Sequence, residues 1–206
     1  PEWDGTDYIA RLADMVHING DHELFTLHLR KWLVAMVASL LEEEVVNHEI
    51  LVFIGRQGNY KSTFFNRLLP PKLQSYFYTK TNNNRLTNDD LLTLSEFALI
   101  CLEEIDELRP SELNQLKAMV TLKTVNERAS YGRNKERRPH IASFCGTGNN
   151  PRFLTDPTGN RRWIAVEVQE IDDPHTHPLP YEGLYSQALA LYRLGFRYWF
   201  DLHETV

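Results

Sequence analysis

Four short segments of the chain are mostly apolar at consecutive positions, a pattern that indicates strands buried on both faces of a sheet. They lie at residues 50–54, 97–102, 140–145 and 163–168, and a further short strand is expected at residues 75–78. Strands of a parallel sheet show such runs because helices cover both faces of the sheet. The pattern therefore predicts a sheet at the centre of the fold.

Segments with apolar residues three or four positions apart separate these strands and predict amphipathic helices. The clearest runs from Asp21 to Leu41, and others are expected at residues 62–69, from Thr87 onward, at 110–127 and at 181–202. Thr87 and Asp90 have the spacing of a helix-capping pair. Strands that alternate with helices predict an α/β domain with a mostly parallel central sheet.

Composition and length place the chain among ordinary globular proteins. Of its 206 residues, 42% are hydrophobic and 24% are charged, which excludes disordered and collagen-like chains. We expect a helical lead-in, residues 1–48, packed on a core of residues 49–206. Because the sequence does not begin with Met, we expect it to be a fragment of a longer protein.

Three features bear on the cellular context. The longest apolar run, residues 32–41, is shorter than the roughly 20 residues that a membrane-spanning helix needs, and predicts a core helix. The first residues do not resemble a signal peptide. Cys101 and Cys145 lie within apolar runs, which excludes a disulfide scaffold. We therefore expect a cytoplasmic location and no membrane partner.

The segment between the first strand and its helix has the layout of a phosphate-binding loop. It reads Gly55-Arg56-Gln57-Gly58-Asn59-Tyr60-Lys61-Ser62-Thr63, against the pattern G-x-x-x-x-G-K-[ST]. In such loops backbone N–H groups bind phosphate oxygens, the lysine reaches the β- and γ-phosphates, and the hydroxyl ligates Mg²⁺. Tyr60 stands where the pattern has its second glycine. We expect residues 55–63 to bind ATP, with Mg²⁺ on Ser62.

The second buried strand ends in acidic residues. Residues 97–102 lead directly into Glu103, Glu104 and Asp106. In P-loop ATPases a strand of this kind brings carboxylates to the Mg²⁺ shell and to the attacking water. We assign Glu103 to the metal and Glu104 to the water, with Asp106 as a competitor for either role. The alternative is a solvated acidic turn without chemistry.

Two further segments supply candidates for contact with the γ-phosphate. Asn149 follows the strand at residues 140–145, which we expect between the other two, so that its amide would reach the attacking water or the γ-phosphate. A plain turn of Gly, Asn and Pro residues is the alternative. Arg161 and Arg162 precede the last strand and are candidate arginine fingers, in cis or across a subunit boundary. A solvated arginine pair is the alternative there.

One basic cluster stands out in a chain whose net charge is −6. An expected turn or hairpin tip at residues 131–135 lies within it, and its members are Arg128, Arg133, Lys135, Arg137 and Arg138. A basic loop with an aromatic residue suits a nucleic-acid backbone. We assign Lys135, Arg137 and Arg138 to nucleic acid, and Arg128 and Arg133 as arginine fingers for a neighbouring subunit. A solvated loop is the third reading.

Together these segments resemble the virulence-associated E family, P-loop ATPase domains of primase–helicase proteins that are similar to superfamily 3 helicases. The resemblance extends over residues 24–202, and its most specific part is Phe153-Leu154 followed by Asp156 to Arg162. The other matching segments are Lys31–Ala35, Gly55–Gly58 with Lys61–Thr63, Glu104–Leu108, Leu116–Ala118, Tyr131–Arg133, and Gly146-Thr147 with Asn149. The sequence departs from the family at Tyr60, in the phosphate loop, and at Ala129-Ser130. Prolines are more usual at the latter two positions.

The resemblance implies a function as well as a fold. We expect a three-layer P-loop NTPase of the AAA+-like type that hydrolyses Mg-ATP. It further implies work on single- or double-stranded DNA in a phage or mobile element, and assembly into a homo-oligomeric ring. The rival interpretation is a nucleotide-binding assembly module with negligible hydrolysis.

Overall fold

A six-stranded sheet with the strand order β1-β8-β2-β7-β4-β3 forms the centre of the computed structural model, which describes residues 1–81, 87–127, 131–155 and 162–201. The strands are β1 (Val16–Ile18), β2 (Ile50–Ile54), β3 (Phe77–Lys80), β4 (Leu99–Leu102), β7 (Ser143–Gly148) and β8 (Trp163–Ile171). Only the edge pair β1–β8 is antiparallel, and the other paired strands of this sheet run parallel. The expected α/β fold with a mostly parallel sheet is confirmed.

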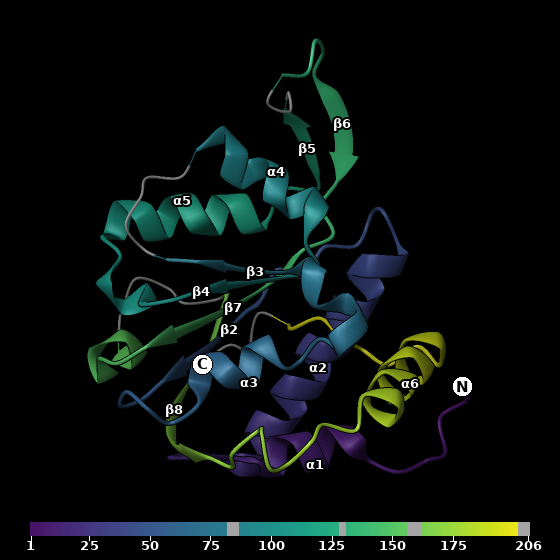
Figure 1. Cartoon of the computed structure of the whole chain (residues 1–206), viewed down its shortest axis with the longest axis vertical. Coiled ribbons are helices and arrows are strands. Elements are labelled where there is room, and N and C mark those ends of the chain that lie inside the picture. The colour runs from purple at the N-terminus through teal and green to yellow at the C-terminus, as the bar shows by residue number, and fades with distance from the viewer. Residues whose placement is uncertain (82–86, 128–130, 156–161, 202–206) are drawn as a thin grey trace.

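Helices cover both faces of the sheet (Figure 1). On one face lie α1 (Tyr8–Asp14), α2 (His22–Leu41), α3 (Lys61–Asn66) and α6 (Tyr181–Arg193). On the other lie α4 (Asn88–Glu96) and α5 (Pro110–Val120). Short 3₁₀ turns occur at η1 (Pro71–Tyr76), η2 (Ile105–Glu107) and η3 (Pro151–Thr155). The Thr87 N–H donates to the Asp90 carboxylate at 2.7 Å, which confirms the predicted cap of α4.

Strand β2 is apolar at every position because both of its faces are buried. Its alternate residues enter two separate cores: Leu51 and Phe53 pack with α1, α2 and α3, whereas the remaining three residues pack with α4 and α5. The Phe53 ring lies 4.5 Å from that of Phe65 and 5.3 Å from that of Phe64, measured between centroids. Helix α3 is thereby fixed on the sheet directly beyond the loop that connects β2 to it.

Helix α2 has a length and composition that would also suit a membrane-spanning helix. Buried core helices of proteins outside membranes share this length and composition. Here 61% of its most apolar window is buried. Trp32, Leu33 and Met36 belong to the core on that face of the sheet, and the Trp32 indole donates to the carbonyl oxygens of Glu49 and Phe144, both at 3.2 Å. The expected core helix at residues 32–41 is confirmed.

Two predicted helices were too long. The one expected at 110–127 ends at Val120, because β5 (Thr124–Glu127) pairs with β6 (Glu136–Pro139) in a separate hairpin. The β-branched residues of this stretch favour a strand over a helix. The helix expected at 181–202 ends at Arg193, since Gly195 takes a left-handed conformation with φ of 79°. The predicted turn at residues 131–135 is confirmed as the hairpin connection.

The strand predicted at residues 140–145 lies further along the chain, at Ser143–Gly148. Glycine is uncommon in strands, which is why the sequence pattern favours a turn at the last residues of β7. Both glycines allow a close approach. A Cβ on Gly146 would lie 3.2 Å from the Leu102 carbonyl oxygen, and one on Gly148 would lie 2.6 Å from Asp106 Oδ1. Strand β7 therefore packs directly against η2.

The first residues contain structure that the sequence analysis missed. Asp7 caps helix α1 by accepting the Ala10 N–H at 3.1 Å, and β1 extends the sheet by pairing with β8. Other elements differ only at their ends: β3 begins at Phe77, β4 at Leu99, α3 ends at Asn66 and β8 continues to Ile171. The division into residues 1–48 and 49–206 stays a prediction.

Candidate functional site

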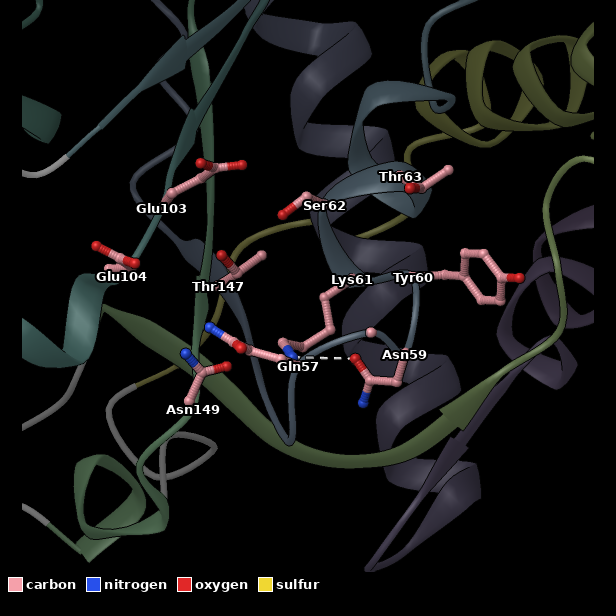
Figure 2. Close-up of a pocket in the computed structure, with 11 residues that line it drawn as sticks. Gln57, Asn59, Tyr60, Lys61, Ser62, Thr63, Glu103, Glu104, Thr147 and Asn149 are labelled. Atoms are coloured by element: carbon pink, nitrogen blue, oxygen red, sulfur yellow. Dashed lines mark hydrogen bonds between the residues drawn. The ribbon is translucent and has the colours of Figure 1, made fainter.

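A cavity of about 320 Å³ lies at the carboxyl ends of three adjacent strands, β2, β7 and β4. In open α/β sheets this is the edge at which ligands bind. The lining residues come from the β2–α3 loop and from the segments that end β4 and β7: Gln57, Gly58, Asn59, Tyr60, Lys61, Ser62, Thr63, Glu103, Glu104, Thr147 and Asn149. Figure 2 shows the acidic pair across the cavity from the loop. The expected position of the Asn149 strand, between the other two, is confirmed.

The Lys61 side chain is folded back onto its own loop. Its Nζ donates to the carbonyl oxygens of Gly55 at 2.8 Å and Arg56 at 2.7 Å, and to Asn59 Oδ1 at 3.0 Å. These contacts use all three donors of the ammonium group, and every acceptor is neutral. Burial lowers the pKa of Lys61, and the negative charge of Asp106 opposes this shift. The loop thus holds a buried cation on acceptors that an anionic ligand could replace.

Gly55 begins the loop at a point where a side chain does not fit. A Cβ there would lie 2.4 Å from the Val168 carbonyl oxygen on β8 and 2.9 Å from Asn59 Nδ2. The Asn59 amide also donates to Val168, at 3.4 Å. The loop is therefore seated against β8, and glycine at its first position is a steric requirement.

Tyr60 adopts the backbone conformation that glycine would take in the pattern. Its φ is 65°, in the left-handed region, and it precedes the first residue of α3. A residue with a Cβ pays roughly 1–2 kcal/mol for this conformation. The ring points away from the acidic pair (Figure 2) and is partly exposed. The departure from the pattern thus changes the side chain but keeps the path of the loop.

Glu103 and Glu104 face the cavity, as expected, and Ser62 lines it from the opposite side. The Glu103 N–H donates to the Lys80 carbonyl oxygen at 3.1 Å, which ties the end of β4 to β3. A hydroxyl and a carboxylate are the hard oxygen ligands that Mg²⁺ prefers. Within the described residues no group of three or more His, Cys, Asp or Glu could hold a metal ion. This donor set fits Mg²⁺ that takes its remaining ligands from phosphate and water.

Asp106 does not line the cavity. Its Oδ2 accepts the backbone N–H groups of Asn149 at 3.0 Å and Asn150 at 2.7 Å. The carboxylate is thus turned toward the segment that follows β7. Of the three acidic candidates, the structure brings two to the cavity and gives the third a different environment.

Thr147 is a lining residue to which the sequence analysis gave no role. It is 6% exposed and lies within β7, between the two glycines. Gln57, Thr147 and Asn149 together give the cavity a wall of neutral polar groups (Figure 2). The sequence pattern ends this strand at Cys145 and so predicts a turn at Thr147, whereas the structure continues β7 to Gly148.

The arginine candidates are not gathered at this cavity. Arg128 and Arg161 lie outside the described residues. Arg162 lies at the amino ends of β2 and β8, whereas the cavity lies at the carboxyl ends of the strands. Its carbonyl oxygen accepts the Ile50 N–H, and its guanidinium donates to the Lys117 carbonyl oxygen, both at 2.7 Å. It therefore does not reach the cavity of its own chain, contrary to the expectation for a finger in cis.

The basic hairpin is also remote from the cavity. Strand β6 leads into the amino end of β7, whereas the cavity lies at the carboxyl end (Figure 1). Arg133, Lys135 and Arg137 are exposed on the hairpin. Arg138 is half-buried and pairs with Glu136 at 3.2 Å and Glu96 at 3.8 Å. The hairpin projects away from the body of the molecule (Figure 1).

A second cavity of about 350 Å³ adjoins the first and shares Ser62, Thr63 and Glu103 with it. Its other lining residues are Asn66, Arg67, Thr79, Cys101 and His175. Arg67 Nη2 lies 2.6 Å from His175 Nδ1, so that His175 accepts the bond there. No sequence spacing linked these residues, because they meet only through the packing of α3 against the loop before α6.

A family model described as the virulence-associated protein E-like domain matches residues 1–205. The chain belongs to this family. Among curated proteins no sequence match is found. The resemblance noted in the sequence, most specifically in residues 153–162, is thereby confirmed at the level of the family.

Solved structures show the same fold in a longer protein. "The apo structure of NrS-1 C terminal region (305-718)" matches with a TM-score of 0.60 and 15% identity, over 100% of this chain and 48% of that one. "The A form apo structure of NrS-1 C terminal region-CTR(305-718)" has a TM-score of 0.57 and 15% identity, over 99% and 47%. The chain spans about half the length of these solved chains. At such identity the likeness concerns the fold alone.

The conformation of Tyr60 gives a stability test. We expect Tyr60→Val to have a free energy of unfolding about 1 kcal/mol below that of Tyr60→Gly, because a β-branched residue is strongly disfavoured at positive φ. Urea denaturation of both variants measures the difference. At Gln169, an exposed residue of β8, the same two substitutions should rank in the opposite order. Equal order at both positions would contradict the left-handed loop.

Proposed function

We propose that this domain binds and hydrolyses Mg-ATP as part of a replication protein of the helicase or primase–helicase type, in a phage or mobile element. One observation carries the proposal: the buried Lys61 ammonium, which donates to three neutral acceptors, shares a cavity with Glu103 and Glu104. A buried cation stabilises bound anions, and carboxylates across from it suit a metal ion and a water molecule.

The strand order supports assignment to the three-layer P-loop NTPases of AAA+-like type. The loop that carries Lys61 connects β2 to α3, and the acids follow β4, two strands away in the sheet. Helices on both faces complete the three layers (Figure 1). In this arrangement phosphate would lie over the carboxyl ends of β2 and β7, where Lys61 exchanges its carbonyl partners for phosphate oxygens.

Ser62 and Glu103 would hold the magnesium ion, Ser62 through its hydroxyl and Glu103 through its carboxylate. The ion supplies charge neutralisation for the phosphates. Glu104 would accept a hydrogen bond from the attacking water and take its proton as the bond to the γ-phosphorus forms and the bond to the leaving oxygen breaks. Thr147 and Asn149 would orient the γ-phosphate or this water by hydrogen bonds.

The basic hairpin is proposed to contact DNA, single- or double-stranded. Lys135 and Arg137 are exposed on this hairpin. Arg138 is half-buried and forms ion pairs with Glu136 and Glu96. Neither Arg133 nor Arg162 reaches the cavity of its own chain, so each of these two could act as an arginine finger only on the nucleotide of a neighbouring subunit. That role fits a homo-oligomeric ring in which Arg133 of one subunit serves the nucleotide of the next. Arg128 and Arg161, which lie outside the described residues, stay candidates as well, Arg161 in cis or across a subunit boundary.

A second candidate function is a nucleotide-dependent assembly module with negligible hydrolysis. The observation that favours it is the lining of the cavity, which contains no arginine among the described residues. A cytoplasmic location belongs to either proposal, since Cys101 and Cys145 are buried free thiols and burial raises the pKa of Cys145 well above its usual value.

Lys61→Ala tests the phosphate site. We expect ATP affinity to fall by roughly ten- to a hundredfold, since a charge-assisted contact of this kind contributes about 1.5–3 kcal/mol. Calorimetric titration measures it, with circular dichroism to confirm the fold. Lys72→Ala removes the same charge from an exposed turn and serves as the control. Unchanged ATP binding by a folded Lys61→Ala protein would refute the site.

Glu104→Gln separates hydrolysis from binding. The amide keeps the shape but cannot take a proton, so turnover should fall by about 10²-fold or more while ATP affinity is retained. Phosphate release and nucleotide titration measure the two quantities. Glu107→Gln, on an exposed position of the same segment, is the matched control. The assembly-module alternative is supported instead if wild-type protein binds ATP but releases no phosphate, alone or with DNA.

Lys135→Ala tests the hairpin. Loss of one phosphate contact should weaken single-stranded DNA binding and reduce the slope of log K against log[salt] by about 0.7. Binding is measured by fluorescence anisotropy at several salt concentrations. Arg193→Ala removes one positive charge from the exposed end of α6, which lies away from the hairpin (Figure 1), and should leave the slope unchanged. Equal slopes in both variants would exclude Lys135 from the DNA contact.

A further inference from the structure

Asp106 connects the acidic segment to the segment that follows β7. It stands two residues after Glu104 in the 3₁₀ turn η2, and its Oδ2 accepts the N–H groups of both Asn149 and Asn150. Hydrogen bonds to a carboxylate are roughly twice as strong as those between neutral groups. A single side chain thus fixes the backbone of Asn149, a lining residue, relative to the two glutamates.

Gly148 joins the same contact to the phosphate loop. Its carbonyl oxygen accepts the Gly55 N–H at 3.0 Å, and a Cβ at this residue would lie 2.6 Å from Asp106 Oδ1. The acidic turn therefore lies directly on the β7 backbone, and that backbone is bonded to the first residue of the loop. Asp106, Gly148 and Gly55 link the three strand ends around the cavity.

The second oxygen of Asp106 argues against a purely stabilising role. Oδ1 is buried and has no hydrogen-bond partner in the part of the chain that the structure describes. An unsatisfied buried acceptor reduces stability. The negative charge of Asp106 itself also opposes the lowering of the Lys61 pKa that burial causes. The carboxylate therefore affects groups on both sides of the cavity although it does not line it.

We propose that Asp106 is a positioning residue, which holds Asn149 at the distance from Glu104 and Lys61 that hydrolysis requires, and that it neither ligates the metal nor activates water. The inference rests on the proposed ATPase function. Misplacement of a catalytic group by about 1 Å can reduce a rate about 10²-fold. The contact acts on turnover through geometry, and nucleotide binding by Lys61 is left in place.

The test compares Asp106→Ala with Asp106→Asn. Asp106→Ala removes both hydrogen bonds and should lower kcat by about 10²-fold while ATP affinity changes less than about threefold. Asp106→Asn keeps one oxygen as an acceptor and should recover turnover about tenfold relative to Asp106→Ala. Glu107→Ala, in the same turn, is the control and should have wild-type turnover. Turnover equally low in both Asp106 variants would overturn the proposal, as would normal turnover in a folded Asp106→Ala protein.

Gly148→Ala provides an independent route to the same contact. Its methyl group would displace Asp106 Oδ1, so it should lower kcat as Asp106→Ala does, and the double variant should be no worse than either alone. Additive losses would contradict a shared contact. Should Asp106→Ala not fold, the comparison of Asp106→Asn with wild type decides: a loss of about 10²-fold or more, as expected of a removed base, overturns positioning, and a smaller loss supports it.

Amide hydrogen exchange reads the contact without hydrolysis. In Asp106→Ala the backbone amides of Asn149 and Asn150 should exchange at least about tenfold faster, with little change in β2 or α2. If wild-type protein shows no turnover, the proposed function fails and exchange alone decides on Asp106. Unchanged exchange at both amides would refute the positioning role in either case.

Discussion

The hydrogen bond from the Gly55 N–H to the Gly148 carbonyl oxygen closes the site on which the whole account depends. It joins the first residue of the β2–α3 loop to the last residue of β7, and Asp106 joins that same end of β7 to the acidic segment. Because β2, β7 and β4 are parallel, their carboxyl ends lie side by side at one end of the sheet. The segments that follow these ends line the cavity, and they carry Lys61, Glu103 and Glu104.

Close backbone packing around the cavity explains why glycine occurs at positions 55 and 148. A side chain at Gly55 would collide with the β8 backbone, and one at Gly148 would collide with Asp106. Tyr60 shows the converse case, since its backbone is left-handed but its side chain has room to point outward. The loop therefore keeps its path without the second glycine of the pattern, at a cost in local strain of roughly 1–2 kcal/mol.

Sequence reasoning succeeded where periodicity and topology leave little freedom. Residues 50–54 could be assigned because a strand buried on both faces must be apolar throughout. Lys61, Glu103, Glu104 and Asn149 could be brought together because the carboxyl ends of parallel strands share one edge. The family resemblance, confirmed over residues 1–205, rested in part on these segments and most specifically on residues 153–162.

Other features depend on contacts that no spacing reveals. Thr147 was missed because glycines on either side suggested a turn, whereas close packing against η2 makes them part of a strand. The second cavity, with Arg67 and His175, arises only from the packing of distant segments. The direction in which Asp106 points depends on the backbone of residues 149 and 150, so its part in the site could be recognised only in three dimensions.

The most direct measurement is a crystal structure of the wild-type domain with Mg²⁺, ADP and beryllium fluoride. The account predicts that Lys61 Nζ leaves the carbonyl oxygens of Gly55 and Arg56 and contacts the phosphate and fluoride groups. It also predicts Ser62 and Glu103 beside the metal and Asn149 facing the fluoride. Nucleotide bound outside this cavity, or Lys61 still on its loop carbonyls with nucleotide present, would contradict it.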